Sequence, residues 1–127
     1  GSYRLTEGDH RRVFVATGTG LAPFLPMFRS LAERGRLDSA ELIFGCATRA
    51  DDITAALAPL PAQTTVCVSR EEPPAGGVRG RVTAALAGLA FDPATTDFHI
   101  CGSAAMVADC RALLTAAGAQ RISTEPF

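Results

Sequence analysis

Residues 12–24 of the chain read RVFVATGTGLAPF, and this stretch indicates how the chain folds. Its first part, Arg12 to Ala16, carries β-branched and apolar side chains and predicts a buried strand. The apolar side chains after the glycines recur at helical spacing, which predicts a helix over residues 21–34. The segment Thr17-Gly18-Thr19-Gly20 therefore forms a tight turn between a strand and a helix.

Such a turn has two interpretations that the stretch leaves open. Glycines let the backbone approach an anion, and the N-terminus of a helix supplies N–H groups and a positive dipole end, so the turn can hold a phosphate. It can also be a structural turn without a ligand. It is neither the GxGxxG fingerprint, because Pro23 stands in place of the third glycine, nor a Walker loop, because no Lys follows.

The rest of the chain continues the alternation of short apolar runs and longer amphipathic runs. We expect further strands at residues 41–44, 64–69, 97–101 and 120–124, and further helices at residues 51–57, 82–87 and 104–117. A loop rich in proline and glycine spans residues 70–80. Five strands alternating with four helices predict an α/β fold, a doubly wound parallel sheet with helices on both faces. Ligands bind such sheets beyond the carboxyl ends of the strands.

Composition and charge exclude several classes of protein. The 127 residues make one domain, and 47% of them are hydrophobic, enough for a buried core. Twelve basic residues stand against thirteen acidic ones, which disfavours a nucleic-acid partner. No apolar run is long enough to span a membrane, and no signal peptide opens the chain.

Four cysteines and two histidines are too scattered for a metal site. None of the cysteines forms a CxxC pair, and neither His10 nor His99 lies near a cysteine pair in the sequence. His99 alternates along a buried strand and is expected in the core. Because a disulfide-rich secreted scaffold carries more cysteines in a shorter chain, we expect reduced thiols and a cytoplasmic location.

Four motifs carry a resemblance to a known family. The turn TGTGLAPF, residues 17–24, is similar to the GTGxAPF segment of the ferredoxin–NADP reductase family, in its nicotinamide-nucleotide half. Ser69-Arg70-Glu71 with Gly80-Arg81-Val82 resembles the SRE…GRV stretch. Residues 101–107, CGSAAMV, resemble CGxxxMV, and Glu125-Pro126-Phe127 resembles the closing acidic-x-aromatic signature. The motifs occur in the family's order and cover nearly the whole chain.

The resemblance implies a three-layer, Rossmann-like fold with the five predicted strands in the order 3-2-1-4-5. It also implies a flavin-binding barrel that precedes this domain in relatives. We therefore expect residues 11–127 to be the NAD(P)-binding domain. Residues 1–10 are then a linker from the missing flavin-binding domain or a cloning scar.

The resemblance also assigns roles to individual residues. It places the dinucleotide's diphosphate on the first turn, with Gly102 and Met106 near the nicotinamide; the residues of the turn are Thr17, Gly18, Thr19, Gly20 and Pro23. Catalytic positions by resemblance are Cys101 beside the nicotinamide, Glu125 near it, and Phe127 against the flavin. Ser103 departs from the proline common in the family.

A basic cluster in the loop after the third predicted strand points to the choice of cofactor. In NADP-using relatives, serine and basic side chains at these positions bind the 2′-phosphate; the residues here are Ser69, Arg70, Arg79 and Arg81. Guanidinium groups suit a phosphate monoester, and two charge-assisted bonds give about a hundredfold preference or more. We therefore expect NADP ahead of NAD. Asp51 and Asp52 can instead bond ribose hydroxyls and repel a phosphate, or cap a short helix.

These expectations combine into one function and its rivals. We expect the NAD(P)H-binding domain of a flavin-dependent oxidoreductase, inactive when isolated, whose parent passes hydride to FAD and then electrons to a ferredoxin, iron–sulfur or haem acceptor. The partners are the flavin-binding domain of the same parent chain and a redox acceptor. The alternatives are a non-catalytic nucleotide-binding module for sensing or assembly, and a flavodoxin-like FMN or receiver domain.

Overall fold

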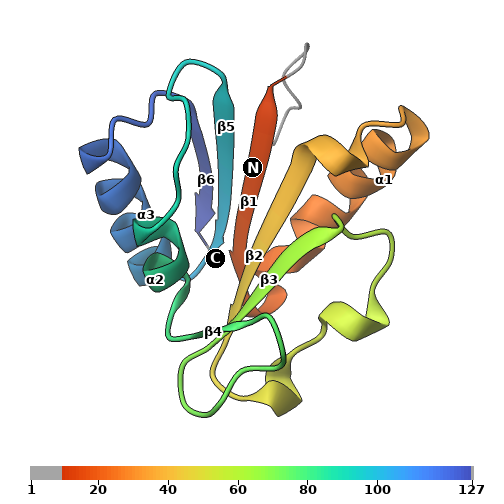
Figure 1. Ribbon diagram of the computed structural model, residues 1–127, viewed down its shortest axis with the longest axis vertical. Coiled ribbons are helices and arrows are strands. Elements are labelled where there is room, and N and C mark those ends of the chain that lie inside the picture. The colour runs from red at the N-terminus through yellow and green to blue at the C-terminus, as the bar shows by residue number, and fades with distance from the viewer. Residues whose placement is uncertain (1–9, 127) are drawn as a thin grey trace.

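Six parallel strands form one sheet in the computed structural model, which describes residues 10–126 (Figure 1). Across the sheet the order is β4-β3-β2-β1-β5-β6, and every neighbouring pair is parallel. The strands are β1 (Arg11–Thr17), β2 (Ala40–Cys46), β3 (Gln63–Val68), β4 (Val78–Arg79), β5 (Thr96–Gly102) and β6 (Ile122–Pro126). All strands therefore present their carboxyl ends at one edge, the lower edge in Figure 1.

The parallel α/β sheet is confirmed, but the predicted number of five strands is wrong. The five predicted strands take the expected relative order, and β4 adds a sixth strand beside β3. It consists of two residues, paired with Cys67 and Val68, within the loop predicted over residues 70–80. Two residues are too short for a periodic signal, so only the return of this loop to β3 creates the strand.

Three α-helices and four 3₁₀ turns connect the strands. The helices are α1 (Leu25–Glu33), α2 (Val82–Ala87) and α3 (Ala104–Ala116); the 3₁₀ turns are η1 (Gly18–Phe24), η2 (Leu37–Ser39), η3 (Arg49–Asp51) and η4 (Thr54–Ala56). The helix predicted over residues 21–34 is thus α-helical only from Leu25. Pro23 and Pro26 lack backbone N–H groups, and a proline is tolerated in the first turn of an α-helix, where α1 has Pro26.

The short helix predicted over residues 51–57 is absent and replaced by η3 and η4. Asp52, between the two turns, has extended backbone angles (φ −76°, ψ 109°). Its Oδ1 atom accepts hydrogen bonds from the Thr54 backbone N–H at 3.0 Å and the Thr54 hydroxyl at 2.6 Å. This local side-chain bonding competes with helical bonding and interrupts the helix.

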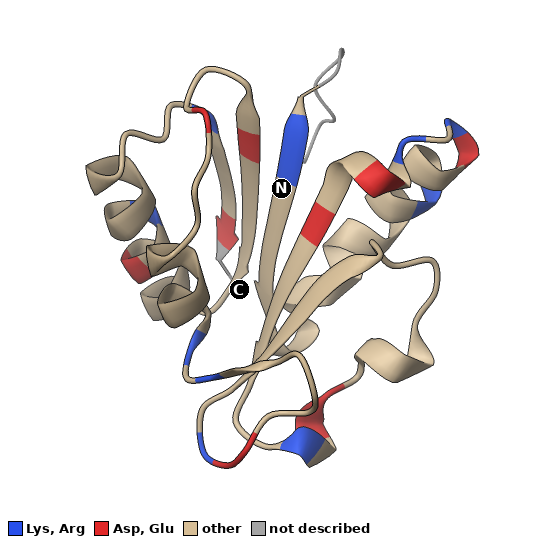
Figure 2. Cartoon of the chain, in the orientation of Figure 1, with Lys and Arg blue, Asp and Glu red and all other residues tan. Residues whose placement is uncertain are grey.

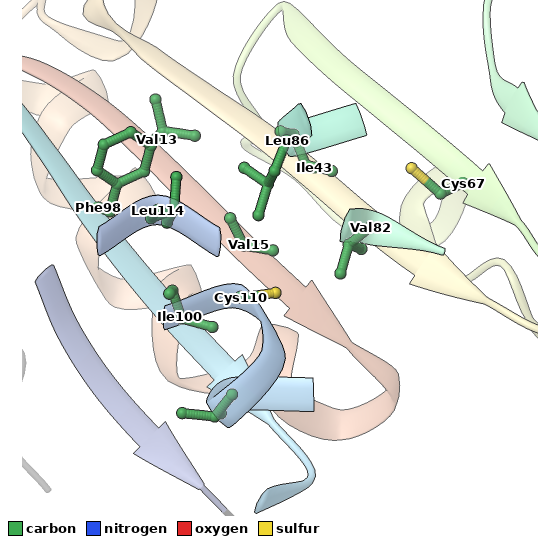
Figure 3. Close-up of a cluster of buried hydrophobic side chains, with 11 residues drawn as sticks. Val13, Val15, Ile43, Cys67, Val82, Leu86, Phe98, Ile100, Cys110 and Leu114 are labelled. Carbon is green, nitrogen blue, oxygen red and sulfur yellow. The ribbon is translucent and has the colours of Figure 1, made fainter. Parts of the chain in front are cut away.

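Helices cover both faces of the sheet, and each face has its own core (Figure 1). On one face α2 and α3 pack over the sheet through a cluster that includes Val15, Ile100, Leu86 and Leu114 (Figure 3). On the other face η1 and α1 pack through a second cluster, which contains Phe14, Phe24 and Phe28. The ring centroids of Phe24 and Phe28 lie 5.0 and 4.8 Å from that of Phe14, and both rings meet the Phe14 ring edge-on. The second cluster includes Leu21 and Phe24 of η1 and so anchors the segment that follows β1.

Polar groups close the opposite edge, where the strands begin. Asp97, only 3% exposed, accepts a hydrogen bond from Arg121 Nε, and His10 Nδ1 lies 3.3 Å from its carboxylate. Arg11 binds Glu41 and donates to the Ala90 carbonyl at 2.7 Å. Within residues 10–126, no helix is both long and apolar enough to cross a membrane.

Candidate functional site

A cavity of about 700 Å³ opens at the carboxyl ends of the strands. It lies where the strand order reverses, because the chain passes from β1 to β2 on one side and β5 pairs with β1 on the other. The N-terminal turns of α2 and α3 complete its walls with Val82, Thr83, Ala105 and Met106. Its place in the sheet is where ligands bind in parallel α/β proteins.

The first turn forms the floor of this cavity. Thr17, Gly18 and Thr19 line it, and Gly18 has a positive φ of 53°, which favours glycine. Gly20 is buried beneath the turn, where an added Cβ atom would lie 2.3 Å from the Cys101 carbonyl oxygen. The first residues of a helix leave backbone N–H groups without intrahelical partners, so η1 presents donors at this place. Pro23 lies further along η1, exposed and outside the cavity.

The loop after β2 forms a second wall. Cys46, Ala47, Ala50, Asp51 and Ile53 line the cavity. Asp51 Oδ2 accepts a hydrogen bond from the Thr48 hydroxyl at 2.9 Å, whereas Asp52 bonds Thr54 and does not line the cavity.

Only part of the basic cluster reaches the cavity. Ser69 and Arg81 line it, and the Ser69 backbone N–H donates a hydrogen bond to the Cys46 carbonyl oxygen at 3.1 Å. Arg70 does not line the cavity, and Arg79 Nη1 pairs with Glu72 Oε1 at 3.1 Å. Basic and acidic residues both occur in the loop that joins β3 to β4 (Figure 2). Arg49 is also outside, with its backbone N–H bonded to the Glu71 carboxylate. The sequence indicated two or three guanidinium groups here, and the fold brings one.

The end of β5 contributes Ser103 and Met106 but not the Cys101 thiol. Cys101 is 1% exposed and packs in the cluster beneath η1. Gly102 is buried beside Thr17 and Met106 and also stays outside the cavity. Ser103 caps α3, because its Oγ atom accepts a hydrogen bond from the Met106 backbone N–H at 3.2 Å.

The C-terminal strand brings Glu125 next to Cys101. The two residues are paired in the register of β5 and β6, and Glu125 is half-buried. It does not line the cavity. Phe127 lies outside the described residues.

Burial governs the protonation of the thiols and of His99. It is the main cause that raises the pKa of Cys67 and of Cys110 to about 11, and that of Cys46 above its ordinary value. Burial also lowers the pKa of His99 to about 4, opposed by Asp97 and assisted by Arg12. These thiols and this imidazole are neutral at pH 7, and the four cysteines form no disulfide. Among residues 10–126, no group of three or more His, Cys, Asp or Glu residues could hold a metal ion.

Sequence reasoning missed several residues of the cavity. Ile53 is a large hydrophobic side chain that stays 42% exposed. Ala50 and Asp109 also line the cavity without belonging to any motif, and Ala105 lines it from an unspecified position of the segment 101–107. The one sequence signal for Ile53 is an apolar side chain directly after two aspartates, in a segment predicted as a short helix.

Comparisons with known proteins identify related sequences. A family model described as "Oxidoreductase NAD-binding domain" matches residues 14–112. The anthranilate 1,2-dioxygenase electron transfer component of Acinetobacter baylyi is 43% identical over 51 residues, 40% of this chain and 15% of that protein. The chain therefore matches a small part of that relative.

Solved structures share the fold. The flavohem-like FAD/NAD-binding domain of nitric oxide dioxygenase from Vibrio cholerae O1 biovar El Tor has a TM-score of 0.85 at 22% identity, covering 100% of this chain and 55% of that one. A ferredoxin NADP⁺ reductase from Neisseria gonorrhoeae, with FAD and NADP bound, has a TM-score of 0.71 at 27% identity, covering 91% and 55%. The chain thus spans about half the length of these two structures.

Proposed function

Because the chain belongs to the oxidoreductase NAD-binding domain family, we propose that it binds NAD(P)H and presents the nicotinamide ring to a flavin held by another domain. The observation that carries the proposal is the cavity at the reversal of the strand order, floored by the turn Thr17–Gly20. Its volume of about 700 Å³ falls within the range of small-molecule and cofactor sites.

The diphosphate lies over the turn after β1 in this proposal. Gly18 and Thr19 line the cavity there, and a side chain at Gly18 would stand where the anion approaches. The helix N-terminus adds donors and a favourable dipole. Gly20 and Pro23 contribute by shaping the turn. A dinucleotide diphosphate therefore fits the residues that are present.

The adenosine half extends toward β2 and β3. The adenine base packs against Ile53, because an aromatic ring over this exposed side chain removes apolar surface from water. The 2′-phosphate of NADP lies by Ser69 and Arg81, which both line the cavity. Arg70 and Arg79 contribute to the positive electrostatic potential of this region and do not contact the 2′-phosphate. One charge-assisted bond of about 1.5 kcal/mol gives roughly a tenfold preference for NADP over NAD.

The nicotinamide half extends toward the end of β5. Met106 lines that end of the cavity, and Cys101 with Gly102 forms the buried strand end behind it. In this proposal the carboxylate of Glu125, on β6, assists proton transfer near the nicotinamide. The role proposed for Phe127, which lies outside the described residues, is to cover the flavin. When bound, the dinucleotide supplies the hydride and the flavin accepts it. The residues of this chain orient the ring and exclude water.

The remaining parts of the proposal concern the parent protein. Residues 11–127 form the dinucleotide domain, and residues 1–10, of which 1–9 lie outside the described residues, join it to the flavin-binding domain. A ferredoxin, iron–sulfur or haem acceptor then takes the electrons, in the cytoplasm. A module that only senses a nucleotide requires the same cavity but no hydride acceptor.

Calorimetric titration of the chain with NADP⁺ and NAD⁺ tests the proposal. We expect both to bind, NADP⁺ the more tightly. Arg81→Ala weakens NADP⁺ about tenfold or more and leaves NAD⁺ nearly unchanged, because only NADP⁺ presents a phosphate to the guanidinium. Arg29→Ala, an equal charge change on the exposed surface of α1, is the matched control.

Two results would contradict the proposal at different levels. If neither dinucleotide binds the unaltered chain, the assignment of the cavity is wrong. If Arg81→Ala weakens NADP⁺ and NAD⁺ equally, the cavity holds a dinucleotide but Arg81 does not hold the 2′-phosphate.

A further inference from the structure

Two side chains of opposite charge, Arg81 and Asp51, line the cavity from the loops after β3 and β2. Arg81 reaches it from the segment that precedes α2, and Asp51 reaches it from η3, after β2. Ser69, at the end of the neighbouring strand β3, lines it between these loops. The lining holds one further carboxylate, that of Asp109, which belongs to α3 beside Met106. Asp51 is therefore the carboxylate on the β2 side of the cavity, where the adenosine half is proposed to lie.

The Asp51 carboxylate is held at the cavity by its own loop. It ends the 3₁₀ turn η3, and its Oδ2 atom accepts the Thr48 hydroxyl hydrogen bond at 2.9 Å. The adjacent Asp52 is occupied by both donors of Thr54 and does not line the cavity. Of the two aspartates, Asp51 is thus the one placed to meet a ligand.

The surroundings of Cys46 show that this wall is electronegative. Cys46 also lines the cavity, and burial is the main cause that raises its pKa. The carboxylates of Asp52, Asp51 and Glu71 raise the pKa further, because they disfavour a thiolate among them. An additional negative group entering beside Cys46 meets the same repulsion.

We propose that Asp51 limits the preference of the cavity for NADP: its carboxylate disfavours the 2′-phosphate of NADP and accepts a hydrogen bond from the ribose hydroxyls of NAD. This inference rests on the proposed function, since it needs a dinucleotide in the cavity. A ribose hydroxyl is a neutral donor, whereas a phosphate monoester carries a charge of about −1.5 to −2 and no donor at neutral pH. A nearby carboxylate therefore discriminates between the two cofactors, and it opposes Arg81.

Asp51→Asn isolates this charge. Asparagine keeps the shape and an oxygen that can accept the Thr48 hydroxyl bond, so the loop is retained. With NAD⁺ and NADP⁺ as probes in calorimetric titrations, we expect the NADP⁺ to NAD⁺ affinity ratio to rise about fivefold to tenfold. Asp38→Asn, the same charge removal in the exposed turn η2 before β2, should leave the ratio unchanged. Raising the salt concentration should reduce the effect of Asp51→Asn.

The outcomes separate the inference from the function on which it rests. An unchanged ratio in Asp51→Asn, with both dinucleotides still bound, overturns the role of Asp51 and leaves the proposed function standing. An equal shift in Asp38→Asn also overturns it, because the effect then comes from net charge. Failure of the unaltered chain to bind either dinucleotide overturns both.

Discussion

Gly20 shows how a single position ties the first turn to the rest of the site. The residue is buried between the turn and β5, and the Cys101 carbonyl oxygen occupies the space that a side chain would need. This close approach is what brings the turn after β1 and the end of β5 together at one edge. The glycine is therefore needed for packing, whereas Gly18 is needed for its positive φ.

Gly20→Ala should destabilise the chain. A Cβ atom 2.3 Å from a backbone oxygen forces the turn and β5 apart, and overpacking of this kind costs about 1–3 kcal/mol. Gly88→Ala is the matched control, because Gly88 has a negative φ of −95° and no heavy atom within 4 Å of the added Cβ. Urea unfolding measures both. Equal midpoints for the two variants would show that the turn moves freely away from β5.

The basic residues show which part of the site could not be predicted from the sequence. The sequence predicts Arg70, Arg79 and Arg81 together in the loop after the third predicted strand. In the structure Arg79 lies in β4 and Arg81 directly precedes α2. The direction of each side chain depends on β4, whose pairing with β3 leaves Arg79 beside Glu72 and Arg81 at the cavity. A strand of two residues has no signature in the sequence, so this choice could not be predicted.

Among the elements, those with clear periodicity and clear termini were predicted well. α2 has the predicted bounds, and α3 ends one residue before the predicted end, next to Gly118 with its positive φ. The errors lie where short-range bonding overrides periodicity. Two prolines delay α1 to Leu25, and the side chain of Asp52 divides the segment that follows β2.

Helix α3 is capped by a side chain, which provides a test of the wall it forms. Ser103 accepts a hydrogen bond from the Met106 backbone N–H, and replacing such a serine by alanine costs about 1 kcal/mol. Ser103→Ala should lower the free energy of unfolding by this amount, measured in urea. Ser103→Asp restores the acceptor and should recover most of the loss. A stability of Ser103→Asp as low as that of Ser103→Ala would refute the capping role.

At the level of the whole molecule, the parallel sheet converts distant motifs into one site. The turn after β1, the loops after β2 and β3 and the end of β5 are separated by up to about ninety residues, yet all meet at the carboxyl edge (Figure 1). The two cores on opposite faces hold this edge in place. The proposed function needs a flavin-binding domain at this edge, because the flavin accepts the hydride.

The chain alone should therefore bind NADPH without oxidising it. Mixed with NADPH and ferricyanide, it should produce no faster loss of absorbance at 340 nm than buffer does. Added free FAD should change this little, since unlinked reactants lack the effective concentration that a bound, oriented flavin has. Rapid oxidation by the chain alone would show that hydride transfer does not need a flavin-binding domain.

The alternation of apolar runs and amphipathic runs was sufficient to predict a parallel sheet. Each run is a local pattern, because an apolar run indicates a buried strand and an amphipathic run indicates a helix with one buried face. The turn Thr17–Gly20 could likewise be predicted, since glycines directly before a helix are a local signal. The sixth strand, the burial of the Cys101 thiol and the presence of both Asp51 and Arg81 in the lining of one cavity depend on contacts between segments far apart in the chain. Such contacts follow from packing the two faces of the sheet, and no local pattern records them.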